Sequence, residues 1–305
     1  MRILITGTSG LLGLNLAMQA RETNTVIGVD RTRLAGLPFE QIQVNLLETG
    51  QVEHTLEVTK PDWLVHCAAL ANLEACESDP ALATRLNTDL PGELATACAC
   101  GGVRMVQIST DAVFDGTQTG LYTEEDEAHP LSVYARTKLD GERAVLAANP
   151  QVLVARVNFY GFSRSGERSL AEFFIKNLSA GVPMKGFRDV MFNPTFVGDL
   201  ADLLICMLEL ELSGVYHTVS PQVMSKHAFG VALARRFGWD ESLIVADSVD
   251  RSGLVAQRSH NLGLSVHKLS TGLGKSLPLF FTGLERFYTQ YQQGYPQKIK
   301  SYPQQ

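Results

Sequence analysis

The chain opens with Met1-Arg-Ile-Leu-Ile-Thr6-Gly7-Thr8-Ser9-Gly10-Leu11-Leu12-Gly13, and the fold follows from this stretch. Its apolar run, residues 3–5, is typical of a strand that is buried on both faces. Glycines then recur at every third position, and residues 11–20 continue with the apolar spacing of a helix. A strand, a glycine-rich turn and a helix in this order predict the first unit of an α/β fold.

The same turn predicts an anion site, because free N–H groups and the helix dipole there attract a phosphate. Gly7 permits a tight turn, Gly10 lets a pyrophosphate approach the backbone, and Gly13 lets the helix lie close to the sheet. Taken by themselves, these glycines are also consistent with an ordinary glycine-rich turn that binds no ligand. However, a second strand follows at residues 25–30 and ends in Asp30. An acid there can accept hydrogen bonds from the ribose of NAD, so the sequence predicts a dinucleotide site.

The composition indicates a globular protein with a large core. The 305 residues, 45% of them hydrophobic, suffice for one large domain or two coupled lobes. The net charge is −6 and no block of like charge stands out, so we expect no nucleic-acid partner. We also expect no membrane span and no metal site, since no apolar run is long enough and no second pair of zinc ligands accompanies Cys98 and Cys100.

Two features favour a cytoplasmic location. Met1 begins the first strand directly, which leaves no room for a signal peptide. The chain has five cysteines, an odd number, which indicates reduced thiols in place of a disulfide framework.

Strand and helix patterns alternate through the first half of the chain. Repeated βα units predict a Rossmann-type, doubly wound parallel sheet, with the ligand beyond the carboxyl ends of the strands. We expect further strands at 41–45, 63–67, 103–109 and 152–157, and helices at 51–58, from about 80 to 100, and from 132 onwards.

The alternation is interrupted after residue 160. We therefore expect residues 1–160 to form the dinucleotide-binding domain, with 195–220 returning to it. Residues 161–194 and 221–305 should form a smaller C-terminal, substrate-binding lobe. Thr195 is a candidate cap for a helix that ends near residue 210. The tail after Gln292 is rich in Gln, Pro and Lys, which predicts weak order.

A candidate proton donor lies in the helix that starts near Ser132, a plausible N-cap. Tyr134 and Lys138 are four residues apart, so they project from one face of this helix. A neighbouring ammonium lowers the pKa of a tyrosine, which is about 10 in model peptides. A pair of this spacing can also be an ordinary exposed pair. Its position shortly after the strand that ends in Thr110 favours an acid–base role.

Three motifs together resemble the extended short-chain dehydrogenase/reductase family, within its dTDP-4-dehydrorhamnose reductase-like branch. They are Thr6-Gly7-x2-Gly10-x2-Gly13, Ser109-Thr110-Asp111-x-Val113-Phe114-Asp115-Gly116, and Tyr134-x3-Lys138. Residues 76–87 and 193–201 agree with this branch, and the likeness covers about residues 1–207.

The resemblance implies NAD or NADP as the cofactor and a nucleotide-linked 4-keto sugar as the substrate. It implies that the reduced cofactor supplies a hydride, Tyr134 donates a proton, Thr110 positions the carbonyl, and Lys138 holds the nicotinamide ribose. It is also compatible with a homodimer. The implied cofactor residues are Gly7, Thr8, Ser9, Gly10, Leu11, Leu12, Gly13, Asp30, Arg31, Asn45, Leu46, Cys67, Ala68, Ala69, Tyr134, Lys138 and Asn158. The implied substrate residues are Thr110, Asp111, Val113, Phe114, Tyr134, Phe159, Arg188 and Asn193.

The sequence departs from this family at two places. Asn45 stands where the family often has Asp near the adenine, and Asn158-Phe159 where the reductases often place a Trp against the sugar. The first departure has little effect on the expected cofactor site, whereas the second leaves the identity of the sugar open. Asp30 favours a free ribose hydroxyl, while Arg31 and Arg33 could hold a 2′-phosphate, so NAD and NADP both stay open.

Two other functions are consistent with the motifs. A sugar-nucleotide epimerase or dehydratase would use the same fold, but such dehydratases usually carry Asp-Glu after the Thr, and Ala112 follows Asp111 here. The family also contains a cofactor-binding regulatory subunit with little turnover. The presence of both Tyr134 and Lys138 favours a reductase over this alternative.

Overall fold

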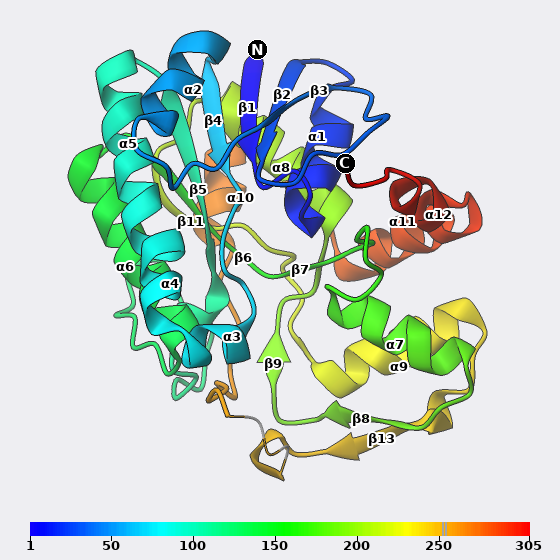
Figure 1. Ribbon diagram of the computed structural model, residues 1–305. Helices are drawn as coiled ribbons and strands as arrows, with labels where there is room; N and C mark the ends of the chain where they lie inside the picture. The colour runs from blue at the N-terminus through cyan, green and yellow to red at the C-terminus, as the bar shows by residue number, and fades with distance from the viewer. Residues whose placement is uncertain (252, 254) are drawn as a thin grey trace.

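A seven-stranded parallel sheet forms the centre of the molecule (Figure 1). The computed structural model describes residues 1–251, 253 and 255–305. The strand order is β11-β6-β5-β4-β1-β2-β3. The strands are β1 (Arg2–Thr6), β2 (Thr25–Asp30), β3 (Glu40–Gln43), β4 (Trp63–His66), β5 (Arg104–Thr110), β6 (Leu153–Val157) and β11 (Gly214–His217). This confirms the predicted Rossmann-type α/β fold.

Helices cover both faces of this sheet, which explains the continuous apolar run in β1. Ile3 and Ile5 pack against α1 (Leu11–Ala20) and α8 (Val197–Glu209). Leu4, which points the other way, packs with residues of α2 (Gln51–Thr59) and α5 (Leu90–Gly101). Successive side chains of a strand face opposite sides, so a strand between two helical layers must be apolar at every position.

The helical region predicted at about 80–100 is interrupted. It consists of α4 (Pro80–Thr84), a π-helical turn (Arg85–Asp89) and α5, and the short helix α3 (Leu73–Ser78) precedes it. Pro91 has no N–H, so the usual bond to the carbonyl of Asn87 is absent, and the ladder widens at this point. Asn87 is fully buried, and its side chain bonds to the backbone of Leu70 and to Thr137 of α6 (Val133–Ala148).

A second group of elements lies beside the carboxyl ends of the strands (Figure 1). It contains three two-stranded pairs and helices that pack on one another. The pairs are β7 (Phe159–Tyr160) with β10 (Thr195–Phe196), β9 (Met191–Phe192) with β12 (Met224–Ser225), and β8 (Met184–Phe187) with β13 (Ile244–Asp247). The helices are α7 (Leu170–Ser179) and α9 (Lys226–Phe237), with short 3-10 turns at Glu241–Leu243 and Val249–Arg251. A further 3-10 turn, Asp111–Val113, directly follows β5 of the main sheet.

Thr195 does not cap the helix that follows it, contrary to the sequence-based expectation. The N-cap of α8 is Phe196. The Thr195 hydroxyl oxygen instead accepts a hydrogen bond from the N–H of Ser220 at 2.8 Å. Among the described residues, no helix is long and apolar enough to cross a bilayer.

The predicted weak order of the C-terminal tail is wrong. Helices α10 (His267–Leu273) and α11 (Phe280–Gln292) are followed by α12 (Tyr295–Lys300), whose Ile299 is fully buried in the main core. The backbone of Pro303 accepts a hydrogen bond from Ala35 at 2.9 Å. The polar composition of the tail concealed the few apolar residues, Ile299 and Tyr302 among them, that attach it to the domain.

We expect Ile299→Ala to lower the free energy of unfolding by about 2–5 kcal/mol, because it removes a buried aliphatic side chain and leaves a cavity. Urea denaturation of the variant and the wild-type protein measures this difference. Lys298→Ala, at an exposed position of the same helix, is the matched control and should change stability little. Equal stability of the Ile299→Ala and wild-type proteins would show that the tail does not contribute to the core.

Candidate active site

A cavity of about 390 Å³ lies at the carboxyl ends of the sheet strands, and we call it the strand-end cavity. Its walls come from the β1–α1 turn, the ends of β4, β5 and β6, the start of α6, and residues of the second group of elements. This is the position expected for a ligand site in a doubly wound sheet.

The β1–α1 turn is shaped by its glycines. Gly7 has a φ of +72°, in the left-handed region, and its N–H donates to the carbonyl of Val29 at 2.8 Å. A Cβ placed on Gly13 would lie 2.3 Å from the Gly7 carbonyl oxygen, and one on Gly10 would lie 3.0 Å from the same atom. The helix can therefore start this close to the strand only because these positions lack side chains.

Asp30 supports this turn from the end of β2. Its carboxylate accepts one hydrogen bond from the N–H of Ser9 at 2.8 Å and one from the N–H of Thr32 at 2.9 Å. The buried Thr8 hydroxyl accepts a hydrogen bond from the Gln41 amide at 3.1 Å. Thr8, Ser9 and Asp30 thus hold the shape of the turn, and none of them lines the strand-end cavity.

Thr110, Tyr134 and Lys138, which come from two elements, all line the strand-end cavity. Thr110 ends β5, while Tyr134 and Lys138 lie one turn apart on α6. The helix starts here because the Ser132 hydroxyl accepts a hydrogen bond from the N–H of Ala135. Lys138 Nζ donates to the carbonyl of Ile108 at 2.6 Å, which attaches α6 to β5 two residues before Thr110.

The expected lowering of the Tyr134 pKa by Lys138 is wrong. Burial raises the pKa of Tyr134 to about 12, and a hydrogen bond with Thr110 offsets only part of this effect. Burial also lowers the pKa of Lys138 to about 8, against the opposing effect of the Glu142 carboxylate. Desolvation therefore outweighs the attraction between charges in this part of the cavity, and Tyr134 carries its proton at neutral pH.

Asp111 lies between the catalytic candidates and the second group of elements. It is buried, and burial raises the pKa of its carboxyl to about 6 even though the nearby Lys226 ammonium favours the charged form. Its oxygens accept hydrogen bonds from Asn158 Nδ2 at 2.6 Å and from the Thr110 hydroxyl at 3.1 Å. The Thr110 hydroxyl thus donates its hydrogen bond to Asp111. Asn158 lines the cavity and also donates a hydrogen bond to Asp111.

The structure brings together about half of the residues that the sequence assigned to ligands. Those that line the strand-end cavity are Gly7, Gly10, Leu11, Leu12, Gly13, Cys67, Ala69, Thr110, Asp111, Tyr134, Lys138, Asn158 and Phe159. Those outside its lining are Thr8, Ser9, Asp30, Arg31, Asn45, Leu46, Ala68, Val113, Phe114, Arg188 and Asn193. Arg31 and Asn45 lie beyond the cavity, after the ends of β2 and β3.

Four of the predicted substrate residues face away from the strand-end cavity. Val113 and Phe114 are fully buried in a core of their own, where the Phe114 ring stacks on Tyr122 at 4.1 Å. Asn193 is also fully buried, and its amide bonds to the backbone of Ser220 and Leu264. Arg188 is exposed after β8. A motif spacing does not reveal which way such side chains point, since that depends on distant elements.

Several cavity residues were missed by the sequence reasoning. Arg168, Lys226 and Arg258 bring three cationic side chains to the strand-end cavity, together with Gln257, Ser259 and Leu262. Arg168 Nη1 lies 4.0 Å from where a Cβ on Gly10 would be. Arg258 donates to Glu74 Oε1 at 3.0 Å. These cations are isolated in the sequence and only folding brings them together.

Among the described residues, no group of three or more His, Cys, Asp or Glu side chains is arranged to hold a metal ion.

The chain is similar in sequence to a known protein family. Residues 1–293 match the family model of the RmlD substrate binding domain. The chain belongs to this family. The match confirms the resemblance to the dTDP-4-dehydrorhamnose reductase-like branch of the extended short-chain dehydrogenase/reductases, and it extends that resemblance across nearly the whole chain.

Relatives of this RmlD-family chain carry several kinds of name, among them the following. A dTDP-4-dehydrorhamnose reductase of Mycobacterium tuberculosis is 32% identical over 87% of this chain and 84% of its own length. The methionine adenosyltransferase 2 subunit beta of Mus musculus is 36% identical over 93% of this chain and 86% of its own length. The crystal structure of a dTDP-4-dehydrorhamnose reductase from Clostridium acetobutylicum superimposes with a TM-score of 0.85, at 28% identity, over 96% of this chain and all of that one.

The contact at Gly13 predicts a local stability effect. Gly13→Ala should lower the free energy of unfolding by about 1–3 kcal/mol, because the new methyl group would overlap the Gly7 carbonyl. Gly92→Ala in helix α5 is the matched control, since its Cβ would lie at an ordinary 3.4 Å from the Ala144 side chain of α6. The control should be neutral or slightly stabilising, because Ala favours a helix over Gly. Chemical denaturation of both variants measures the contrast, and equal values would contradict the tight packing of this turn.

Proposed function

We propose that this chain is an NAD(P)H-dependent reductase of a nucleotide-linked 4-keto sugar. The observation that carries the proposal is the joint presence of Thr110, Tyr134 and Lys138 in the cavity that the glycine turn closes. The related reductase of Mycobacterium tuberculosis supports the substrate class, since its name specifies a dTDP-linked keto sugar.

The β1–α1 turn fits a dinucleotide. The first N–H groups of α1 have no partner within the helix, and Leu11, Leu12 and Gly13 line the strand-end cavity at that point. Arg168 lies over Gly10 and adds a positive charge where a pyrophosphate would approach. When bound, the reduced nicotinamide would supply the hydride. Lys138 would hold its ribose, and Cys67 and Ala69 would border the cofactor at the end of β4.

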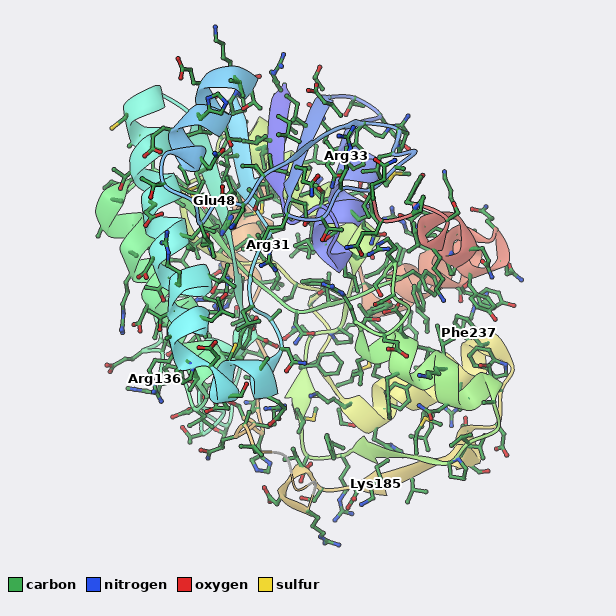
Figure 2. The ribbon with its side chains drawn as sticks, viewed as in Figure 1. Arg31, Arg33, Glu48, Arg136, Lys185 and Phe237 are labelled. Atoms are coloured by element: carbon green, nitrogen blue, oxygen red, sulfur yellow. The ribbon has the colours of Figure 1, made fainter. Side chains whose placement is uncertain are left out.

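The choice between NADH and NADPH depends on residues beyond the cavity. Both carboxylate oxygens of Asp30 accept hydrogen bonds from the backbone, so Asp30 is less free to select a ribose hydroxyl than the sequence indicated. Arg31 and Arg33 follow Asp30 in the chain and are exposed, and they lie apart in the view of Figure 2. Either one could hold a 2′-phosphate. We therefore propose that either reduced cofactor can serve.

The chain supplies the proton and the orientation of the substrate. Tyr134 keeps its phenol proton at neutral pH, because burial raises its pKa to about 12. It can therefore act as the general acid towards the alkoxide that hydride transfer creates. Thr110 donates to Asp111 in this structure, so its hydroxyl would have to turn towards the cavity to hold the substrate oxygen. Phe159 would border the sugar.

A regulatory subunit is the second candidate, favoured by the 36% identity to the mouse methionine adenosyltransferase 2 subunit beta. The cavity, with Tyr134 and Lys138 in place, argues for turnover. An epimerase or dehydratase is disfavoured by Ala112, which lacks the extra acid. The five cysteines are free thiols, in keeping with our proposal of a cytoplasmic location. A homodimer stays an expectation from the family resemblance.

Tyr134→Phe should reduce kcat by about 10²–10⁴-fold, because it removes the general acid and almost no volume. Steady-state reduction of dTDP-linked and other 4-keto nucleotide sugars by the wild-type protein and the variant tests this. Cofactor affinity, measured separately by calorimetry, should survive. Wild-type turnover in the variant, with chemistry shown to limit the rate, would remove Tyr134 from the mechanism. Tight cofactor binding by a wild-type protein that reduces no keto sugar would favour the regulatory role.

Lys226 and Arg258 provide a separate prediction about the substrate. We assign these two cations, which line the strand-end cavity together, to the diphosphate of the nucleotide sugar. Lys226→Met should raise KM for the sugar nucleotide about tenfold or more, since a charged hydrogen bond is lost, and should leave the dissociation constant of the cofactor unchanged. The control is Lys185→Met in the same lobe, because Lys185 lies exposed at the surface (Figure 2) and pairs only with Asp247 among the ion pairs of the described residues. Equal KM values in both variants would rule out this diphosphate site.

A further inference from the structure

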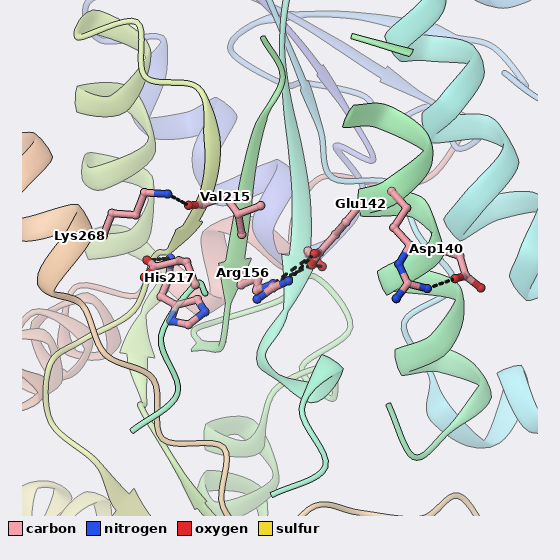
Figure 3. A network of polar contacts seen from close by, with 9 residues as sticks. Asp140, Glu142, Arg156, Val215, His217 and Lys268 are labelled. Carbon is pink, nitrogen blue, oxygen red and sulfur yellow. Dashed lines mark hydrogen bonds and ion pairs between the residues drawn. The ribbon is translucent and has the colours of Figure 1, made fainter. Parts of the chain in front are cut away.

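A buried ion pair lies one turn beyond Lys138 and is not part of the mechanism described above. Arg156 of β6 donates three hydrogen bonds to Glu142 of α6, one from Nη2 at 2.7 Å and two from Nε at 3.0 and 3.2 Å (Figure 3). Their side chains are 3% and 7% exposed. Burying two charges costs solvation energy that their attraction only partly offsets, so such a pair is weak evidence for a gain in stability. Its position suggests another role.

The pair holds the strand that carries Thr110. The Ser109 hydroxyl donates a hydrogen bond to Glu142 Oε1, and Lys138 Nζ donates to the carbonyl of Ile108. Helix α6 is thus bonded to β5 at two successive residues immediately before Thr110. These contacts fix the separation between the helix that carries Tyr134 and the strand that ends in Thr110.

Arg156 extends the contact to the other side of Thr110. Its guanidinium carbon lies 5.1 Å from the centre of the Phe114 ring, over the ring face. Phe114 follows the short 3-10 turn that begins at Asp111. The segment 109–114 is therefore held before and after Thr110 by the same ion pair.

Glu142 also acts on the charge of Lys138, since residues four apart lie on one helix face. Burial lowers the pKa of Lys138 to about 8, and the Glu142 carboxylate opposes this shift. Three other titratable groups face Lys138, namely His66 and Cys67 from the end of β4 and Tyr134 from α6. Burial lowers the pKa of His66 to about 3 and raises the pKa of Cys67 and Tyr134 to about 12, so these three are neutral at physiological pH.

We propose that Glu142, together with Arg156 and Ser109, is a positioning residue that sets the geometry of Thr110, Tyr134 and Lys138 and keeps Lys138 cationic. This inference rests on the proposed reductase function for its kinetic consequences. Its structural consequence, the protonation of Lys138, does not depend on any substrate.

The main variant is Glu142→Gln, which keeps the size of the side chain and removes its charge. The control is Asp140→Asn on the same helix, because Asp140 forms an exposed ion pair with Arg143 (Figure 3). Lys138 is titrated directly by NMR in protein that carries ¹³C at the lysine ε-carbon, with the signal assigned by its loss in Lys138→Met. In Glu142→Gln the midpoint of Lys138 should fall by about one pH unit or more, since an opposite charge close by is lost. In Asp140→Asn it should not move.

The pH dependence of kcat should change in the same direction as the Lys138 midpoint. A lower midpoint means that Lys138 loses its proton at lower pH, so the alkaline limb of the kcat profile should shift to lower pH in Glu142→Gln. At the optimum, kcat should fall about tenfold or more from the altered geometry, with KM nearly unchanged. The melting temperature should also fall, because Arg156 is left buried without its charged partner. Glu142→Asp retains the charge and should restore the Lys138 midpoint but only part of kcat.

Ser109→Ala separates position from charge, and it tests the proposal even if Glu142→Gln does not fold. It breaks the bond to β5 and leaves both charges in place, so kcat should fall while the Lys138 midpoint stays. The proposal is overturned if folded Glu142→Gln shows the Lys138 midpoint and kcat of the Asp140→Asn control, or if Ser109→Ala keeps wild-type kcat. If the wild-type protein reduces no keto sugar, the proposed function fails. The NMR titration then still shows whether Glu142 keeps Lys138 charged, and an unchanged Lys138 midpoint in Glu142→Gln overturns the proposal.

Discussion

The arrangement of the candidate active site depends on how closely α6 lies against the end of β5. This contact is made by a lysine ammonium and a carboxylate that leave water and bond to β5, Lys138 to the Ile108 carbonyl and Glu142 to the Ser109 hydroxyl. Because a buried polar group without a partner is costly, each of these bonds is strongly favoured once the helix is in place. The direction of Tyr134 and its distance from Thr110 follow from this contact.

The other side of the cavity depends on a second close contact, between α1 and the β1–α1 turn. The Gly7 carbonyl approaches α1 so closely that no side chain fits at Gly13. Asp30 then uses both carboxylate oxygens to hold the backbone around this turn. The glycine turn and the strand–helix contact lie at the same edge of one sheet, since parallel strands bring all their carboxyl ends together. An edge of this kind can hold a dinucleotide and a reacting carbonyl side by side.

Desolvation sets the charges of this site more than pairwise attraction does. It raises the pKa of Tyr134 to about 12, lowers that of Lys138 to about 8 and raises that of Asp111 to about 6. Tyr134 consequently keeps its proton at neutral pH, and the pKa of Lys138 lies close to that range. The relatives include reductases and a methionine adenosyltransferase 2 subunit beta. Since one fold can serve several functions, the function of this chain has to be argued from the residues of the cavity.

The sequence by itself determined the parallel sheet, the glycine turn and the shared helix face of Tyr134 and Lys138, because these depend on short-range spacing along the chain. Tertiary structure alone decided that Lys226 and Arg258 reach the cavity from distant segments, and that Asn193 and Phe114 point into the core. It also decided the order of the C-terminal tail, where Ile299 is buried by elements far away in sequence. The pKa of Tyr134 was likewise decided by the tertiary structure. A neighbouring lysine can be read from the sequence, whereas the loss of water around both groups arises only when the chain is folded.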